Sequence, residues 1–393
     1  MRVSTLWLNE LAGTNLAARE LATEFDAKGV PVADISRIGE AFEGSVVVEV
    51  AGLGARTVTV FDGRNVQEVE CAVAELKEDA RLAFHPERRK VLTEQDVGLT
   101  ESPVPVQLPE QAESGRPVLD FVDDSVLILD PPPNRGDLTG IVGLARELAS
   151  YRGREWRPSQ VAQPPGVEQI AERLSLEVTD QGDTPDYIAR LVTGVRVGPA
   201  PFWLRWRLAA CGLRAISNVV DVTNYLLFKY GQPLHAFDFG RIRGARIVTR
   251  RARGQESITT IDGVRRQLDE GILVIADEAR PVAVAGIMGG IETEIGIGTH
   301  EVLIECARFN PAVIRRGART LGLATEASER FERGTDPSVM EPASREAAAL
   351  IAQFAGGRVL AGVCEARSEV PVRALGLSWT RTNRLLGLQL TPA

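Results

Sequence analysis

Only three histidines occur among 393 residues, at positions 85, 235 and 300. His235 lies in GQPLHAFD (231–238), just after an apolar run, VVDVTNYLLF (219–228), that is broken by Thr223 and Asn224. A histidine in such surroundings can bind a ligand, act as a base or pack in the core, and packing is the most common of the three. Because the histidines are far apart in the sequence, a serine triad would depend on His235 and little else, and no HExxH zinc pair occurs.

Two further segments carry residue types that suit a ligand site. The glycine-rich stretch AGIMGGIETEIGIG (285–298) predicts either tight turns or close approach of the backbone to a ligand, which glycine permits because it has no side chain. Glu305 sits in the apolar stretch VLIEC (302–306). A carboxylate is costly to bury there without a partner, so Glu305 either has one or faces solvent at an edge. No P-loop, complete dinucleotide fingerprint or GxSxG elbow occurs.

Composition limits the possible classes of function. The formal net charge of −8 excludes nucleic-acid binding through a general positive field, so any RNA contact must be local. Four cysteines without a CxxC pair indicate neither a disulfide framework nor a zinc site. The first residues, MRVSTLWLNELAG, are too polar for a signal peptide, and no apolar run approaches the roughly 20 residues of a membrane span. We therefore expect a cytoplasmic protein with no membrane or DNA partner.

The pattern along the chain predicts mixed elements rather than regular βαβ units. Residues 14–29 predict a helix that Thr14 and Asn15 cap and Gly29 ends. Period-two stretches between 44 and 72 predict a small β module, and proline-rich stretches at 100–117 and 155–166 predict linkers. Later segments predict a strand at 125–130, strands within 244–254, 256–263 and 271–277, and helices within 138–148, 199–213 and 341–357. The arginines of RIRGARIVTRRARG (241–254) either lie on a solvated strand face or track RNA phosphate.

Three segments in this order resemble the beta subunit of bacterial phenylalanine–tRNA ligase. They are VVDVTNYLLFKYGQPLHAFDF (219–239), VAGIMGGIETEIG with VLIECARFNP (284–296 and 302–311), and GLATEASERFERGTDP (322–337). MRVSTLWLNEL (1–11) and PNRGDLTGIVGLARELA (133–149) are similar to the split first module of that subunit. The resemblance covers nearly the whole chain. It implies an editing domain, which hydrolyses tyrosine wrongly attached to phenylalanine tRNA.

The resemblance also implies the residues of the editing pocket, namely Thr223, Pro233, His235, Ala285, Gly286, Gly289, Glu305, Thr325 and Ala327. In the family, Glu305 would pair with the tyrosine hydroxyl, the only atom that distinguishes tyrosine from phenylalanine. His235 would hold the substrate or the attacking water. The small residues at 285, 286, 289 and 327 leave room for an aromatic ring and for backbone contacts to the ester-linked ribose.

On this basis we expect a multi-domain α+β protein with a mixed α/β editing domain. The expected parts are a split N-terminal α/β module (1–41 and 118–160), a short, degenerate OB-like insertion with its linker (42–117), the editing domain (161–365) and the beginning of a further module (366–393). The chain would be either a truncated beta subunit or a shortened paralogue. Its partners would be the 3′ end of phenylalanine tRNA carrying tyrosine and, in a full-length beta chain, the ligase alpha subunit.

The resemblance further implies no metal or cofactor in this chain, since ATP and Mg²⁺ serve only the complete ligase, and no aminoacylation by this chain alone. Two other functions stay open with the same fold. The first is a non-catalytic scaffold that grips tRNA or a partner subunit. The second is a binding module for aromatic amino acids.

Overall fold

The computed structural model describes residues 1–71, 76–101, 103–156, 168–368 and 374–391. Helices and strands are mixed along the chain, so the mixed α/β class predicted from the sequence is confirmed. The boundaries of the predicted domains stay predictions. Most of the proline-rich stretch at 155–166, predicted as a linker, lies outside the described residues.

A small sheet joins the two ends of the N-terminal part of the chain. Its strands lie in the order β1 (Arg2–Ser4), β9 (Asp124–Leu129) and β2 (Val32–Ile38), all antiparallel. Three helices belong to the same part, namely α1 (Thr5–Ala12), α2 (Ala18–Ala27) and α4 (Ile141–Tyr151). Because β9 lies between β1 and β2, segments from both sides of the intervening β module form one sheet.

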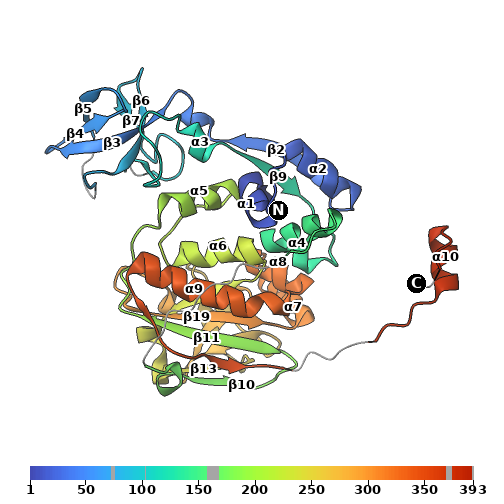
Figure 1. The fold of residues 1–393 in the computed structure, drawn as a ribbon. Coiled ribbons are helices and arrows are strands. Elements are labelled where there is room, and N and C mark those ends of the chain that lie inside the picture. The colour runs from blue at the N-terminus through green and yellow to red at the C-terminus, as the bar shows by residue number, and fades with distance from the viewer. Residues whose placement is uncertain (72–75, 102, 157–167, 369–373, 392–393) are drawn as a thin grey trace.

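The β module between these segments is an antiparallel sheet. Its main path runs β5 (Val66–Glu70), β4 (Thr57–Phe61), β3 (Val46–Leu53), β6 (Arg81–His85) and β7 (Lys90–Val91). A further short strand, β8 (Gln107–Leu108), pairs with β6, so the stretch predicted as a linker at 100–117 contributes to this sheet. Val58 and Val60 of β4 are buried in alternation, as a period-two pattern predicts, whereas Val47 and Val48 of β3 are consecutive and both buried. The short helix α3 (Leu119–Val122) leads back to the N-terminal sheet (Figure 1).

The chain from residue 168 to residue 368 is built on two sheets and several helices. The first sheet has the order β12 (Leu234–Asp238), β19 (Glu301–Arg308), β11 (Asp186–Thr193) and β20 (Arg358–Val359), with β21 (Cys364–Ala366) also paired to β11. The second has the order β10 (Ser175–Val178), β13 (Arg246–Arg251), β16 (Leu273–Ala276), β17 (Pro281–Val284) and β18 (Met288–Gly289). A separate hairpin joins β14 (Ser257–Thr259) to β15 (Arg265–Gln267).

Five helices accompany these sheets, namely α5 (Phe202–Ala210), α6 (Val220–Tyr230), α7 (Pro311–Leu321), α8 (Glu326–Arg333) and α9 (Met340–Ala355). In Figure 1, α6 and α9 lie over the sheet that contains β19 and β11. The last helix, α10 (Trp379–Leu386), lies apart from the rest of the fold, and none of its side chains is buried.

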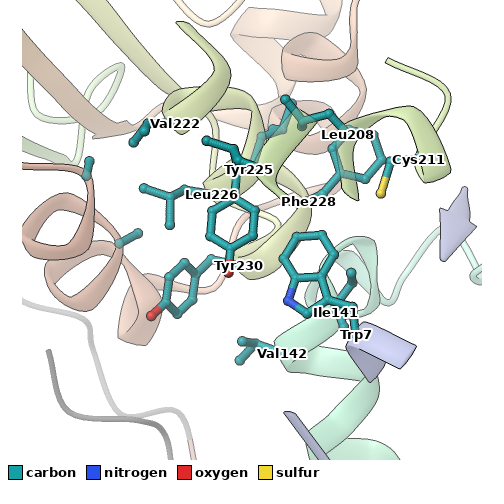
Figure 2. Close-up of a cluster of buried hydrophobic side chains, with 14 of the residues drawn as sticks. Trp7, Ile141, Val142, Leu208, Cys211, Val222, Tyr225, Leu226, Phe228 and Tyr230 are labelled. Atoms are coloured by element: carbon teal, nitrogen blue, oxygen red, sulfur yellow. The ribbon is translucent and has the colours of Figure 1, made fainter. Parts of the chain in front are cut away.

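Helix α6 is enclosed on nearly all sides and connects the N-terminal part to the two-sheet part. Figure 2 shows Trp7 of α1, Ile141 of α4 and Leu208 of α5 gathered against it. The Trp7 and Tyr225 rings stack with centroids 4.7 Å apart. One turn after Tyr225, Lys229 donates to the Glu346 carboxylate of α9 at 2.6 Å within the buried interior. The position of α6 is therefore fixed by contacts with four other helices, α1, α4, α5 and α9.

Candidate functional site

His235 and Glu305 are direct cross-strand partners on the antiparallel pair β12 and β19. Side chains opposite each other in such a pair point to the same face of the sheet. That face also carries Phe237 and Leu303, which belong to the core between the two sheets, whereas Ile304 faces the helices. The histidine and the carboxyl group therefore share the inner face of the first sheet.

A cavity of about 320 Å³ opens at this place. It lies at the lower end of the roughly 300–1,000 Å³ of small-molecule sites, which suits a single amino-acid residue. Eight of the nine residues expected in the pocket line it, namely Thr223, Pro233, His235, Gly286, Gly289, Glu305, Thr325 and Ala327. The ninth, Ala285, does not belong to the lining: it is completely buried, and its amide donates to the carbonyl of Leu273 at 3.0 Å.

Two glycines of the cavity allow close packing that no side chain would permit. A Cβ atom on Gly289 would lie 2.7 Å from Nε2 of His235, so this backbone runs directly against the imidazole ring. Gly286 has a φ of +66°, and a Cβ atom there would meet the rings of Phe309 and Phe331 at 2.9 Å. In both places glycine is required, by space at 289 and by space and backbone conformation at 286.

Two helices supply the threonines. Thr223 lies in the first turn of α6, where its hydroxyl donates to the carbonyl of Val220 at 2.8 Å. Thr325 caps the N-terminus of α8: its hydroxyl accepts from the amide of Ser328 at 3.1 Å and donates to the carbonyl of Ile287 at 3.0 Å. The second bond ties α8, which also carries Ala327, to the glycine-rich segment.

The polar atoms at the centre of the cavity lack protein partners. Glu305 is 5% exposed, which excludes the solvent-facing interpretation, and within the described residues its Oε2 atom has no hydrogen bond. Nε2 of His235 is likewise enclosed and unpartnered within the described part of the chain. Burial raises the pKa of Glu305 to about 8 and lowers the pKa of His235 to about 4, because removal from water disfavours the charged form of each. Near neutral pH both groups are mainly uncharged.

Sequence reasoning did not identify several residues of the lining. Among them are Ile216, Asn224, Ile261, Met288, Glu294 and Glu326. Asn224 is the neighbour of Thr223 in the polar pair that interrupts the apolar run, and Glu294 lies within the glycine-rich segment, so both were near a recognised pattern. Ile216 and Ile261 lie in loops where no periodicity marks them.

The N-terminal part of the chain supports the two helices of the cavity. A Cβ atom on Gly140 would overlap the backbone of Gly231 at the end of α6, and one on Gly136 would overlap the backbone of Gly334 after α8. Arg330 of α8 is 4% exposed, and its Nε donates to the carbonyl of Thr139 at 3.2 Å. The 136–140 segment thus holds α6 and α8 at a fixed spacing.

A larger cavity, of about 660 Å³, lies along β10 and β13 and contains none of the expected pocket residues. Three of its four arginines have carboxylate partners: Arg250 binds Glu256 at 2.7 Å, Arg251 binds Asp183 through two hydrogen bonds, and Arg246 binds Glu177. These pairs favour the interpretation of the 241–254 arginines as a solvated, internally neutralised face.

Comparison with known proteins identifies relatives along the entire chain. Residues 183–356 match the B3/4 domain family. The chain is 36% identical over 422 residues to the phenylalanine–tRNA ligase beta subunit of Geobacter metallireducens and 39% identical over 435 residues to that of Moorella thermoacetica, with 100% of this chain and 53% of each relative covered. The chain thus spans about half the length of these curated relatives.

A solved N-terminal fragment of the phenylalanyl-tRNA synthetase beta subunit from Pyrococcus horikoshii is also similar. It is 13% identical and covers 100% of this chain and 85% of its own, with a TM-score of 0.36, which is too low to support an argument about the fold. Within the described residues, no helix is both long and apolar enough to cross a membrane, and no group of three or more His, Cys, Asp or Glu side chains is arranged to hold a metal ion.

Proposed function

The chain belongs to the phenylalanine–tRNA ligase beta-subunit family, and on this premise we propose that its B3/4 domain hydrolyses tyrosine attached to phenylalanine tRNA. One observation carries the proposal. His235 and Glu305, adjacent on β12 and β19, present unpartnered polar atoms to one cavity of single-residue size. Buried polar groups are nearly always paired, so two such atoms at one cavity favour a ligand that completes them.

Glu305 is assigned to the tyrosine hydroxyl. Its side chain is 5% exposed, and a phenol can supply the hydrogen-bond partner that Oε2 lacks among the described residues. Phenylalanine would leave this buried group unpaired, at a cost of about 1–3 kcal/mol. A site built to bond a hydroxyl rejects the analogue that lacks one far better than an apolar pocket rejects an added hydroxyl. The carboxyl group therefore protects correctly charged tRNA.

His235 is assigned to the attacking water or the ester. In the reaction, the water oxygen forms a bond to the ester carbonyl carbon and the bond to the ribose oxygen breaks, which releases tyrosine and leaves a free ribose hydroxyl. The water proton ends on the ribose oxygen. Because the pKa of His235 is lowered to about 4, its imidazole is a weak base near neutral pH. Nε2 therefore orients water through a hydrogen bond rather than by removing its proton.

The proposed partners follow from this reaction. The 3′ end of the tRNA brings the ester to the cavity, and a complete ligase would add the alpha subunit, ATP and Mg²⁺. For this chain alone we propose hydrolysis with water and no aminoacylation. Formation of phenylalanyl-adenylate by the purified chain would contradict that part.

The direct test is single-turnover release of tyrosine from tyrosyl-tRNA by the purified chain, compared with the same tRNA without protein. Accelerated release supports the proposal. If tRNA binds and the ester stays intact, the non-catalytic scaffold is correct instead. If free tyrosine binds without RNA and no ester is hydrolysed, the chain is an aromatic amino-acid binder.

A further inference from the structure

The ionisable side chains that line the cavity are acidic, apart from His235. Three carboxyl side chains belong to the lining, those of Glu294, Glu305 and Glu326, and no lysine or arginine is among the lining residues that the structure describes. An RNA phosphate would be repelled from such a site. A positively charged ligand group, in contrast, binds more favourably in this cavity.

Two of the three carboxyl groups already have a partner or an assigned role. Glu326 is bound by Arg330, whose guanidinium also donates to the Glu326 carbonyl at 2.9 Å. Glu305 is buried deep in the site and is assigned to the hydroxyl end of the ligand. Glu294 differs from both: its side chain is exposed, and within the described residues no hydrogen bond or ion pair engages its carboxylate.

The backbone around Glu294 is held at two points. Before it, the hydroxyl of buried Thr293 donates to the carbonyl of Val282 at 3.4 Å. After it, the hydroxyl of Thr299 donates to the Asp238 carboxylate at 2.8 Å, and Asp238 ends the strand that carries His235. The backbone of the loop with Glu294 is therefore fastened to the same strand as the histidine, at the edge of the cavity.

An amino acid esterified to tRNA carries one cationic group, its α-ammonium, since α-amino groups have pKa values of about 7.7–8.0. We propose that Glu294 recognises this α-ammonium, so that the site selects free-amine aminoacyl esters over N-acylated ones. The inference rests on the proposed function and adds the chemical class that the site accepts. Glu305 then holds the hydroxyl end of the ligand and Glu294 the opposite end, which carries both the ammonium and the ester because these two groups share the α-carbon.

The test compares two ligands that cannot be hydrolysed by this route, tyrosinamide with a free amine and N-acetyltyrosinamide without one. Their affinities are measured by NMR titration for the wild-type chain, for Glu294→Gln and for Glu329→Gln. Glu329 is an exposed carboxylate on α8 outside the cavity lining, so the control makes the same charge change. We expect the wild type to prefer tyrosinamide by about fivefold, the size of a partly exposed ion pair. Glu294→Gln should abolish the preference and Glu329→Gln should keep it.

Equal affinity of the wild type for both ligands, an unchanged preference in Glu294→Gln, or no binding of either ligand would each overturn the inference. Hydrolysis of tyrosyl-tRNA, measured on the same preparations, separates this result from the proposed function. A chain that hydrolyses the ester without an ammonium preference loses only the role of Glu294. A chain with the preference and no hydrolysis retains that role and loses the proposed reaction.

Discussion

His235 and Glu305 lie opposite each other on β12 and β19, and no hydrogen bond or ion pair joins their side chains in the described structure. Neighbouring side chains of this kind usually pair when both are buried. Here burial raises the pKa of the carboxyl group to about 8 and lowers that of the imidazole to about 4. The two groups are thus held close, mainly uncharged and available to a third molecule.

Truncation of His235 should slow hydrolysis of tyrosyl-tRNA without unfolding the chain. We expect His235→Ala to reduce the single-turnover rate on the order of 100-fold, because a misplaced reactant can cost that much. The melting temperature should change little, since the ring lines a cavity rather than filling the packed core. His300→Ala removes an exposed histidine outside the cavity lining and serves as the control. A large fall in melting temperature would instead identify His235 as a core residue.

Substitution of Gly289 should also slow hydrolysis, because the backbone of this glycine runs against the imidazole ring of His235. In Gly289→Ala the new methyl group would lie 2.7 Å from Nε2 of His235, so the ring must move out of its position. We expect the rate of hydrolysis to fall by at least about tenfold, a loss typical of small displacements at a reacting centre. Gly298→Ala is the matched control, because a Cβ atom there meets nothing within 4 Å. Equal activity of the two variants would show that the ring position is not limiting.

The stability of the fold should depend on pH through Glu305. Its pKa is raised from 4.5 to about 8, so between these values the folded chain holds a proton that the unfolded chain releases. The free energy of unfolding then falls as pH rises through the window. His235, with its pKa lowered from 6.5 to about 4, has the opposite effect, but only below pH 6.5. The range from pH 6.5 to about 8 therefore contains the contribution of Glu305 but not that of His235.

Glu305→Gln removes this titration and keeps the shape of the side chain. Urea unfolding of both proteins at pH 6.5 and at about pH 8 should show that the wild type loses up to about 1.4 kcal/mol per pH unit more than the variant. If both free energies of unfolding change in parallel, Glu305 is ionised in the folded chain at neutral pH and its assigned state is wrong.

The arginines of β13 should contribute little to tRNA binding. Arg246, Arg250 and Arg251 are each bound to a carboxylate, so few of their charges are available to displace counterions from phosphate. We expect replacement of all three by glutamine to leave the salt dependence of tRNA affinity unchanged. A shallower dependence of log affinity on log salt would show that these arginines exchange their carboxylates for RNA.

Local patterns in the sequence predict part of the fold well. The valine-rich stretch 46–61 predicts β3 and β4, and alternate residues of β4 are buried because one face of this strand packs in the core. The start of α2 differs from its expectation: the helix begins at Ala18, since Thr14 donates to Asn9 and the Glu20 carboxylate caps the Ala17 amide. Helix α6 shows no amphipathic period because it is buried on nearly all sides.

For the site, the sequence predicts which residues take part but not how they are arranged in space. The resemblance supplies the nine residues, and the structure brings eight of them to one cavity. No local pattern predicts that His235 and Glu305 are in register, because the register of strands so far apart depends on the whole sheet. The support that Gly140 gives to α6 is equally non-local. The unpredicted lining residue Glu294 needs the three-dimensional structure for the same reason.

The central claim is that Glu305 reads the tyrosine hydroxyl, and its most direct measurement is a ratio of two rates. Single-turnover hydrolysis of tyrosyl-tRNA and of phenylalanyl-tRNA is compared for the wild type, for Glu305→Ala and for Glu329→Ala as the exposed control. We expect Glu305→Ala to lower the tyrosine-to-phenylalanine ratio by about 10- to 100-fold, mainly by slowing the tyrosyl substrate, because the variant no longer bonds the hydroxyl. The control should retain the wild-type ratio. If Glu305→Ala retains it as well, Glu305 does not read the hydroxyl, and the tyrosine ring binds elsewhere.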